Sequence, residues 1–260
     1  MADVTIIYKG ETIATMNASG TKTLQTQGKY CEDDIDVEYV KPGGGGNQQA
    51  EADLISGALT GSYTNPLVTS VHSQVFNGSQ VEILNFPNCV EIKDSGFRYA
   101  SKLERIYVPS AQGSPYNNYI FANLPKLSVI ALPSMTRTLP YAFWDDVALT
   151  AVDLGPDFAD FSVKTFNNCS AMTVLVLRRA SSIVSLGNTN CFDGTRFASG
   201  GAGGTIYIPE TLYNHLGDGT ALDYKAAGSW STIDGYGTIT WAKIEGSIYE
   251  NAYADGTPIT

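Results

Sequence analysis

Residues 142–156 read AFWDDVALTAVDLGP, and residues 166–177 read FNNCSAMTVLVL. Both stretches contain a phenylalanine and then the same apolar phrase, in which one apolar residue is followed three and five positions later by two others. In the second stretch these residues are Met172, Leu175 and Leu177. Two apolar residues separated by one other residue are typical of a short strand with one face turned inward. The two stretches therefore predict two similar structural units, one after the other.

The same phrase recurs along the middle of the chain. In most copies it ends in proline, as in VEILNFP (81–87), LERIYVP (103–109) and LSVIALP (127–133). The phenylalanines that precede the copies are spaced by 21, 24, 22, 23 and 26 residues, and they are Phe76, Phe97, Phe121, Phe143, Phe166 and Phe192. Repetition at such a period is typical of a solenoid. We therefore predict a mainly β solenoid of about six coils of about 23 residues each.

The repeat has a direct physical reading. One coil cannot cover its own apolar face, but stacked coils bury a continuous apolar column. The strand of each coil supplies one wall of this column, and the phenylalanine fills the layer from the opposite wall. A further apolar residue recurs about five positions before a phenylalanine and predicts a second short strand in the coil, at Val71, Ile92, Phe161 and Leu186.

The sequence predicts four segments. Residues 1–41 alternate apolar and polar residues at Val4-Ile6-Tyr8 and Ile35-Val37-Tyr39, which indicates a small antiparallel β-module. Residues 42–50 contain four consecutive glycines and are expected to be a linker. The solenoid is expected over residues 51–209, and residues 210–260 are expected to form a cap and tail.

The predicted cap contains three recognisable stretches. ETLYNHL (210–216) and ALDYKAAGSWSTI (221–233) are expected to be helical or turn-like, and YGTITWAKI (236–244) is expected to be a closing strand. A cap is needed because the last coil of a solenoid would otherwise expose its apolar side.

The repeated phrases resemble the BspA-type leucine-rich repeat, whose coils follow the pattern "AF…C..L..I.LP". The resemblance covers about 140 residues and implies a leucine-rich-repeat solenoid. Trp144-Asp145-Asp146 replaces the usual turn that carries a cysteine, and Arg178-Arg179 replaces the closing proline.

The first 41 residues resemble a different group of proteins. The phrase IIYKGETIATMNASGTKTLQTQGKYCEDDIDVEY is similar to segments that open tail-associated and receptor-binding proteins of phages and prophages of gut bacteria. The resemblance is carried by Gly10, Ile13, Thr23-Leu24, Gly28-Lys29-Tyr30-Cys31 and Asp34-Ile35. It implies that residues 1–41 attach the solenoid to other tail or baseplate proteins, and it suggests a homotrimer.

Composition argues against several classes of partner. The net charge is -10, and the longest basic run is Arg178-Arg179, so nucleic acid and anionic membrane surfaces are not expected to bind. The chain has no stretch of 18 apolar residues, so membrane insertion is not expected. Its first residues, MADVTIIYKGETIA, do not resemble a secretion signal, and we expect synthesis in the bacterial cytoplasm.

The sequence does not predict an enzyme, a metal site or a cofactor. Cys31, Cys89, Cys169 and Cys191 lack the spacing of a zinc site, and they are expected to be small buried residues. His72 and His215 are expected to be ordinary histidines. The neighbouring acids Asp145-Asp146 should point apart rather than share a substrate.

The candidate binding residues lie mainly on the outward side of the strands. An apolar strip is expected at Val129, Ala131, Ala151, Val174 and Val176, with a rim of Arg105, Tyr107, Asp153, Arg178 and Tyr207. The alternative is that the C-terminal segment covers the strip. On another edge, the loop Tyr116-Asn117-Asn118-Tyr119 has residue types that suit contact with a sugar or a protein, with an ordinary surface loop as the alternative.

These observations lead to one functional hypothesis and two competitors. The leading hypothesis is a non-catalytic phage or prophage tail protein, located in the virion, whose solenoid binds a host cell-surface protein or glycan. The second is a bacterial cell-surface adhesin of the same repeat family. The third, an enzyme acting on host polysaccharide, is disfavoured because the sequence shows no clustered pair of acids.

Overall fold

The computed structural model describes residues 4–8, 11–16, 22–24, 60–112 and 117–244. The chain divides into two compact units, residues 1–52 and 53–260. The first unit contains an antiparallel sheet in the order β1-β2-β3, formed by β1 (Val4–Tyr8), β2 (Glu11–Met16) and β3 (Lys22–Leu24). The predicted strand at Val4-Ile6-Tyr8 is therefore confirmed. The predicted strand at Ile35-Val37-Tyr39 and the linker at 42–50 lie outside the described residues.

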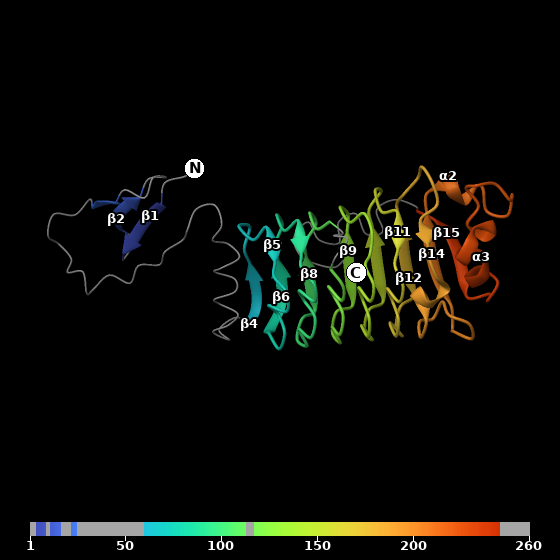
Figure 1. Cartoon of the computed structure of the whole chain (residues 1–260), viewed down its shortest axis with the longest axis horizontal. Helices are drawn as coiled ribbons and strands as arrows, with labels where there is room; N and C mark the ends of the chain where they lie inside the picture. Colours follow the sequence, from blue (N-terminus) through green and yellow to red (C-terminus); the bar gives the residue numbers. More distant parts are fainter. Residues whose placement is uncertain (1–3, 9–10, 17–21, 25–59, 113–116, 245–260) are drawn as a thin grey trace. The chain divides into compact units, whose positions relative to one another are not determined.

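The second unit is a solenoid in which successive coils place parallel strands side by side (Figure 1). One ladder consists of β4 (Thr60–Thr64), β6 (Gln80–Asn85) and β8 (Arg105–Tyr107). A second ladder consists of β9 (Val129–Leu132), β10 (Ala151–Leu154), β12 (Val174–Leu177), β14 (Gly204–Ile208) and β15 (Ile239–Lys243). The predicted mainly β solenoid is confirmed.

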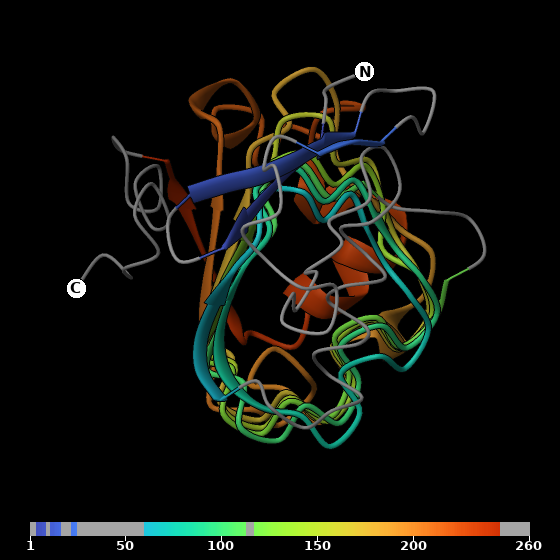
Figure 2. The same ribbon diagram turned by 90° about the vertical axis from the view of Figure 1, so that its left-hand side faces the viewer.

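The strands pair so that equivalent residues of the repeated sequence phrase lie side by side. Val152 of β10 pairs with Ile130 of β9 on one side and with Leu175 of β12 on the other, at separations of 22 and 23 residues. All of these side chains are fully buried. The period read from the sequence is therefore the length of one coil. In Figure 2, which looks along the stack, the outlines of successive coils superpose.

A second set of short strands forms another wall of the coils. β5 (Ser70–Val71) pairs with β7 (Glu91–Ile92), and β11 (Asp160–Phe161) pairs with β13 (Ser185–Leu186). Each strand carries one of the residues expected for this wall: Val71, Ile92, Phe161 and Leu186 are all buried. The second-strand prediction is confirmed.

The six spaced phenylalanines form a continuous ladder through the interior, here called the phenylalanine ladder. Neighbouring rings stack with centroid distances between 5.1 and 5.6 Å, along Phe76, Phe97, Phe121, Phe143, Phe166 and Phe192. All six side chains are 0–1% exposed. Burying a phenylalanine contributes roughly 1.5–3 kcal/mol. The ladder therefore supplies much of the cohesion between coils.

Each rung of the ladder lies in a turn with an unusual backbone. The residues two positions before and two positions after the phenylalanine repeatedly have positive φ, at Gln74, Ser95, Tyr119, Tyr141 and Lys164 before it and at Gly78, Tyr99, Asn123, Asp145, Asn168 and Gly194 after it. Between these positions the Phe121 N–H donates to the Ala142 carbonyl at 2.9 Å, and the Phe143 N–H donates to the Thr165 carbonyl at 2.8 Å. The left-handed residues thus turn the backbone so that it hydrogen-bonds to the next coil.

The C-terminal end of the stack is closed by short helices and a strand. They are η2 (Thr189–Phe192), α2 (Glu210–Tyr213), η3 (Tyr224–Ala226), α3 (Gly228–Asp234) and the closing strand β15. The Trp230 indole N–H donates to the Val184 carbonyl at 2.7 Å, and the Tyr224 hydroxyl accepts the Val184 N–H at 2.9 Å. Both rings are buried, which confirms that this segment caps the solenoid.

Candidate binding surfaces

The outward side of the strands has the register that the sequence predicts. Asp153 pairs with Ala131 and Val176, and Val176 pairs with Tyr207, so these residues form one row across the strands. Val129, Ala151, Val174 and Thr205 form the neighbouring row in the same way. Arg105 and Tyr107 lie on β8, where they pair with Ile83 and Asn85.

The expectation that the apolar strip and its rim are exposed is wrong for two residues of the strip, Ala151 and Val176, and for one residue of the rim, Asp153. Ala151, Asp153 and Val176 are only 4%, 5% and 2% exposed, whereas Val129 and Val174 are half-buried. Ala151 has a short side chain with a valine in register on each side, so its methyl group is shielded by its neighbours. Ala131 and the rim residues Arg105, Tyr107, Arg178 and Tyr207 are half-buried.

Arg178 and Asp153 together explain part of this burial. The Arg178 Nε donates to Asp153 Oδ1 and its Nη2 donates to Asp153 Oδ2, both at 2.8 Å. The two side chains are only 19% and 6% exposed. Val176 lies in register beside Asp153 and two residues before Arg178. The Arg178 side chain therefore extends toward Asp153 on the same side of the sheet as Val176. These residues hold neighbouring coils together and are less available to a partner than predicted.

The turn side of the solenoid carries a second candidate surface. The Tyr119 and Tyr141 rings stack at a centroid distance of 4.7 Å with an interplanar angle of 9°. The Arg98 guanidinium lies between Tyr119 and Tyr99, 4.2 and 4.6 Å from the two ring centroids. The Lys164 ammonium lies 5.7 Å from the Tyr141 ring centroid. We call Tyr99, Arg98, Tyr119, Tyr141 and Lys164 the aromatic stack.

Trp144 extends the aromatic stack. Its ring meets Tyr119 and Tyr141 edge-on, at centroid distances of 6.0 and 6.3 Å. Its indole N–H donates to Asn167 Oδ1 at 3.0 Å, which fixes the orientation of the ring. The side chain is half-buried. Four coils therefore contribute aromatic or cationic groups to one cluster outside the phenylalanine ladder.

A row of polar side chains lies beside the aromatic stack. Arg98 Nε donates to Asn123 Oδ1 at 3.2 Å, and Asn123 Nδ2 donates to Asp145 Oδ2 at 3.4 Å. Asn168 Nδ2 donates to Asp145 Oδ1 at 2.8 Å. We call Asn123, Asp145 and Asn168 the polar row. Its side chains orient one another, and it combines hydrogen-bond donors with acceptors.

The predicted loop at residues 116–119 has a more structural role than expected. Tyr116 lies outside the described residues. Asn117 is buried, and its side chain donates to the Ile92 carbonyl at 2.8 Å. Tyr119 belongs to the aromatic stack. The sequence reading missed Arg98, Tyr99, Tyr141 and Trp144, although each lies one or two positions from a ladder phenylalanine, which is a signal that the sequence does contain.

The two adjacent acids point apart, as expected. Asp145 lies in the polar row, whereas Asp146 is fully buried and accepts the Leu124 N–H at 2.7 Å. Within the described residues its other carboxyl oxygen has no hydrogen-bond partner. Burial raises the pKa of Asp146 well above its usual value. A carboxyl in the solenoid interior is not placed to act on a substrate.

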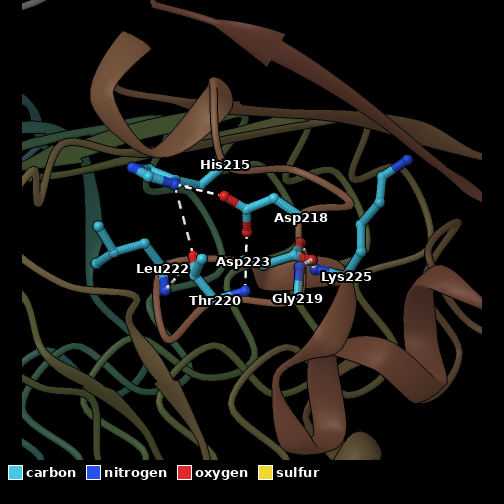
Figure 3. Close-up of polar contacts among 7 residues, drawn as sticks. All are labelled: His215, Asp218, Gly219, Thr220, Leu222, Asp223 and Lys225. Carbon is cyan, nitrogen blue, oxygen red and sulfur yellow. Dashed lines mark hydrogen bonds and ion pairs between the residues drawn. The ribbon is translucent and has the colours of Figure 1, made fainter.

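The cap contains a histidine beside a carboxylate and a hydroxyl (Figure 3). The His215 Nδ1 lies 2.6 Å from Asp218 Oδ2 and 3.5 Å from Thr220 Oγ1. Carboxylate and hydroxyl thus approach the same ring nitrogen, whereas a catalytic triad places them on opposite nitrogens. Backbone N–H donation from Thr220, together with His215, lowers the pKa of Asp218. These contacts hold the loop in its conformation.

Asp223 completes the same loop. Its side chain accepts the Gly219 N–H at 3.0 Å and the Lys225 N–H at 2.9 Å, which caps η3. In the part of the chain that the structure describes, His, Cys, Asp and Glu side chains do not gather in groups of three or more suited to a metal ion. Over the same residues, the helices are too short or too polar to cross a membrane.

The comparison with known families agrees with this architecture. The family described as the BspA type leucine rich repeat region matches residues 59–197 in six copies. The chain belongs to this family. Solenoids of BspA-type repeats are typical of non-catalytic interaction proteins. A search of curated proteins found no significant match.

The two departures from the BspA-type pattern have clear structural roles. In Trp144-Asp145-Asp146, the first residue contacts the aromatic stack, the second belongs to the polar row and the third is buried in the interior. Arg178 stands where most other coils of this chain have proline, and it forms the forked pair with Asp153. The departures therefore change what the coils present outward and leave the stacking of the coils intact.

Proposed function

We propose that this chain is a non-catalytic recognition protein that binds a cell-surface protein or glycan through the outer surface of its solenoid. The family is one of recognition repeats. The observation that carries the proposal is the aromatic stack with Trp144, because tyrosine, tryptophan and arginine are the side chains that contribute most at recognition surfaces. Here they are gathered outside a core that the phenylalanine ladder already fills.

We further propose that the protein acts in a phage or prophage tail. The support for this setting is the resemblance of residues 1–41 to segments that open tail-associated proteins. In this setting residues 1–41 bind other tail or baseplate proteins, the solenoid meets the host surface, and the chain assembles as a homotrimer. The alternative setting is the surface of a bacterial cell, where a BspA-type protein serves as an adhesin.

Adsorption to cells tests the recognition function. The full chain, labelled with a fluorophore, is mixed with a panel of gut bacteria and with host epithelial cells, and bound fluorescence is measured against concentration. We expect saturable binding to at least one cell type, reduced by an excess of unlabelled protein. Linear uptake without competition on every cell type would contradict the proposal.

Fractionation of the producing bacterium separates the two settings. Prophage induction releases particles that are banded by density and analysed by mass spectrometry, and the cell envelope is analysed in parallel. The tail setting predicts that the chain co-purifies with particles. Recovery in the envelope alone, without particles, would instead favour the adhesin.

A further inference from the structure

We propose that the aromatic stack, Trp144 and the polar row form one binding site for a neutral glycan. This inference rests on the proposed recognition function and names the site and the class of ligand. The site spans the coils of Phe97, Phe121, Phe143 and Phe166 on the turn side of the solenoid. It lies apart from the strand face, whose central residues Asp153 and Val176 are buried.

The backbone gives the first argument. Tyr99, Tyr119 and Tyr141 have φ values of 64°, 54° and 62°, in the left-handed region that bulky side chains disfavour. At the position of Tyr99, two residues after the ladder phenylalanine, other coils carry residues that tolerate this region, such as Gly78, Asn168 and Gly194. At the position of Tyr119 and Tyr141, two residues before it, other coils carry the unbranched or small residues Gln74, Ser95 and Lys164. Bulky residues held in a strained conformation are found mainly where function requires them.

The interior gives the second argument. The turns of the site are already anchored from within by Phe97, Phe121 and Phe143, which are fully buried. At the position of Tyr119 and Tyr141, two residues before the ladder phenylalanine, the first two coils have Gln74 and Ser95. These coils adopt the same turn with small or polar side chains. The fold therefore does not require tyrosine at this position.

The chemistry of the side chains points to a sugar. A sugar ring presents an apolar face of C–H groups and an edge of hydroxyl groups. Aromatic side chains suit the first, and oriented amide and carboxylate groups suit the second. Here Tyr99 is 44% exposed and occupies the turn position that Asn123 occupies in the next coil, and Trp144 is half-buried and directly precedes Asp145. Because the two amides of the polar row already orient Asp145, its carboxylate is fixed before a ligand arrives.

The charges favour a neutral ligand over an anionic one. Asp145 lies at the centre of the polar row and would repel a carboxylate or sulfate group on a sugar. The two cations of the site both lie against aromatic rings. Lys164 lies 5.7 Å from the Tyr141 ring centroid. Arg98 is held by Asn123 and by the faces of Tyr99 and Tyr119. Its guanidinium therefore acts mainly as part of the aromatic surface.

Tryptophan fluorescence of the full chain provides the test. The chain has three tryptophans, and Trp230 and Trp241 are buried, so quenching by acrylamide reports mainly on Trp144. The probes are neutral gluco-, galacto-, manno- and N-acetylglucosamine oligosaccharides, first on an array and then in solution. We expect at least one to bind saturably and to protect Trp144 from acrylamide. A sulfated oligosaccharide of the same backbone should bind at least tenfold more weakly.

Four variants separate binding from folding. Tyr119→Asn and Tyr141→Asn place a residue that tolerates positive φ at each position, and Gln74→Asn is the matched control in the first coil, outside the site. We expect the two tyrosine variants to lose binding at least tenfold while their unfolding midpoints stay within about 3 °C of the parent. Gln74→Asn should leave both quantities unchanged. Asp145→Asn, which keeps the shape of the polar row, should also weaken binding at least tenfold.

The outcomes distinguish this inference from the proposed function. If the chain adsorbs to cells but binds none of the neutral oligosaccharides, the glycan site is wrong and the recognition function stands. The same holds if the tyrosine variants bind as the parent does. Unfolding of both tyrosine variants, together with unchanged binding of Asp145→Asn, would show that the cluster is structural. Failure of the chain to bind cells or sugars would overturn both proposals.

Discussion

Arg178 reaches back one coil and forms two hydrogen bonds of 2.8 Å with the carboxylate of Asp153. The two residues are 25 positions apart in sequence, and both side chains are largely buried. Charge-assisted pairs with this forked geometry are among the stronger polar contacts in proteins. The pair links β10 to the end of β12, at the point where most other coils have proline.

Replacing Arg178 with alanine should destabilise the solenoid. The change leaves the Asp153 carboxylate in a buried position without its guanidinium, and breaking a buried pair from one side costs on the order of 3 kcal/mol. Urea denaturation of the full chain measures this cost. The exposed pair Lys126–Glu104 provides the control, and Glu104→Gln should have little effect. Equal losses for the two variants would contradict the structural role of Arg178.

Gly155 should not accept even an alanine. A Cβ atom at this position would lie 1.7 Å from the carbonyl oxygen of Pro133, in the backbone of the preceding coil. Two backbones then have to move apart, and we expect Gly155→Ala to lower the free energy of unfolding by about 2–3 kcal/mol. Gly187→Ala is the matched control, since its nearest contact would be an ordinary 3.7 Å. A Gly155→Ala protein as stable as Gly187→Ala would show that the coils do not approach so closely.

The buried thiols should be unreactive in the folded protein. Cys89, Cys169 and Cys191 are free and fully buried, as the sequence predicted, while Cys31 lies outside the described residues. Burial raises the pKa of Cys89 and Cys191 to about 12 and that of Cys169 well above its usual value. The thiolate is the reactive form. We expect iodoacetamide at pH 8 to leave these three residues unmodified until denaturant is added, as measured by peptide mass spectrometry. Rapid native labelling of Cys169 would contradict its place in the interior.

Asp146 should make the protein less stable as the pH rises. Its pKa is raised in the folded state by burial, so the folded state binds the proton more tightly than the unfolded state does. The protonated carboxyl therefore contributes to the free energy of unfolding. This contribution is fully present when the pH is below 3.8, the ordinary pKa of the group, and it is lost as the pH rises toward the folded-state pKa. Asp146→Asn removes this loss.

Urea denaturation from pH 4 to pH 8 tests the prediction for Asp146. We expect Asp146→Asn to gain stability relative to the parent with each step upward in pH, and the gain should shrink toward pH 4. Parallel pH profiles for Asp146→Asn and the parent would mean that the carboxyl is not buried as described.

The sequence was sufficient to predict the coils because one residue type marks each of them. The spacing of the ladder phenylalanines gave the period, and the positions of Val71, Ile92, Phe161 and Leu186 gave the second strand of the coil. Both patterns follow from burial, and burial is the property that a local sequence pattern reports most directly.

The candidate site was harder to predict because it depends on how side chains meet between coils. Asp153 was expected on an exposed rim, yet its burial depends on Arg178, which lies one coil further along. Tyr119 was noticed as part of a loop, but its partners Arg98 and Tyr141 lie in the coils before and after it. Contacts between side chains at separations of about 20 residues depend on rotamers that the sequence pattern does not specify.

The central claim is that the interior phenylalanines hold the solenoid together, whereas the outer tyrosines contribute little to stability and serve recognition. The free energy of unfolding of Phe121→Ala and of the double variant Tyr119→Asn/Tyr141→Asn, measured side by side in urea, tests it most directly. We expect Phe121→Ala to lose about 3–5 kcal/mol, because a cavity is added to the lost burial. The double variant should lose less than about 1 kcal/mol, since relief of backbone strain offsets the lost ring stacking. Comparable losses in the two proteins would contradict the account.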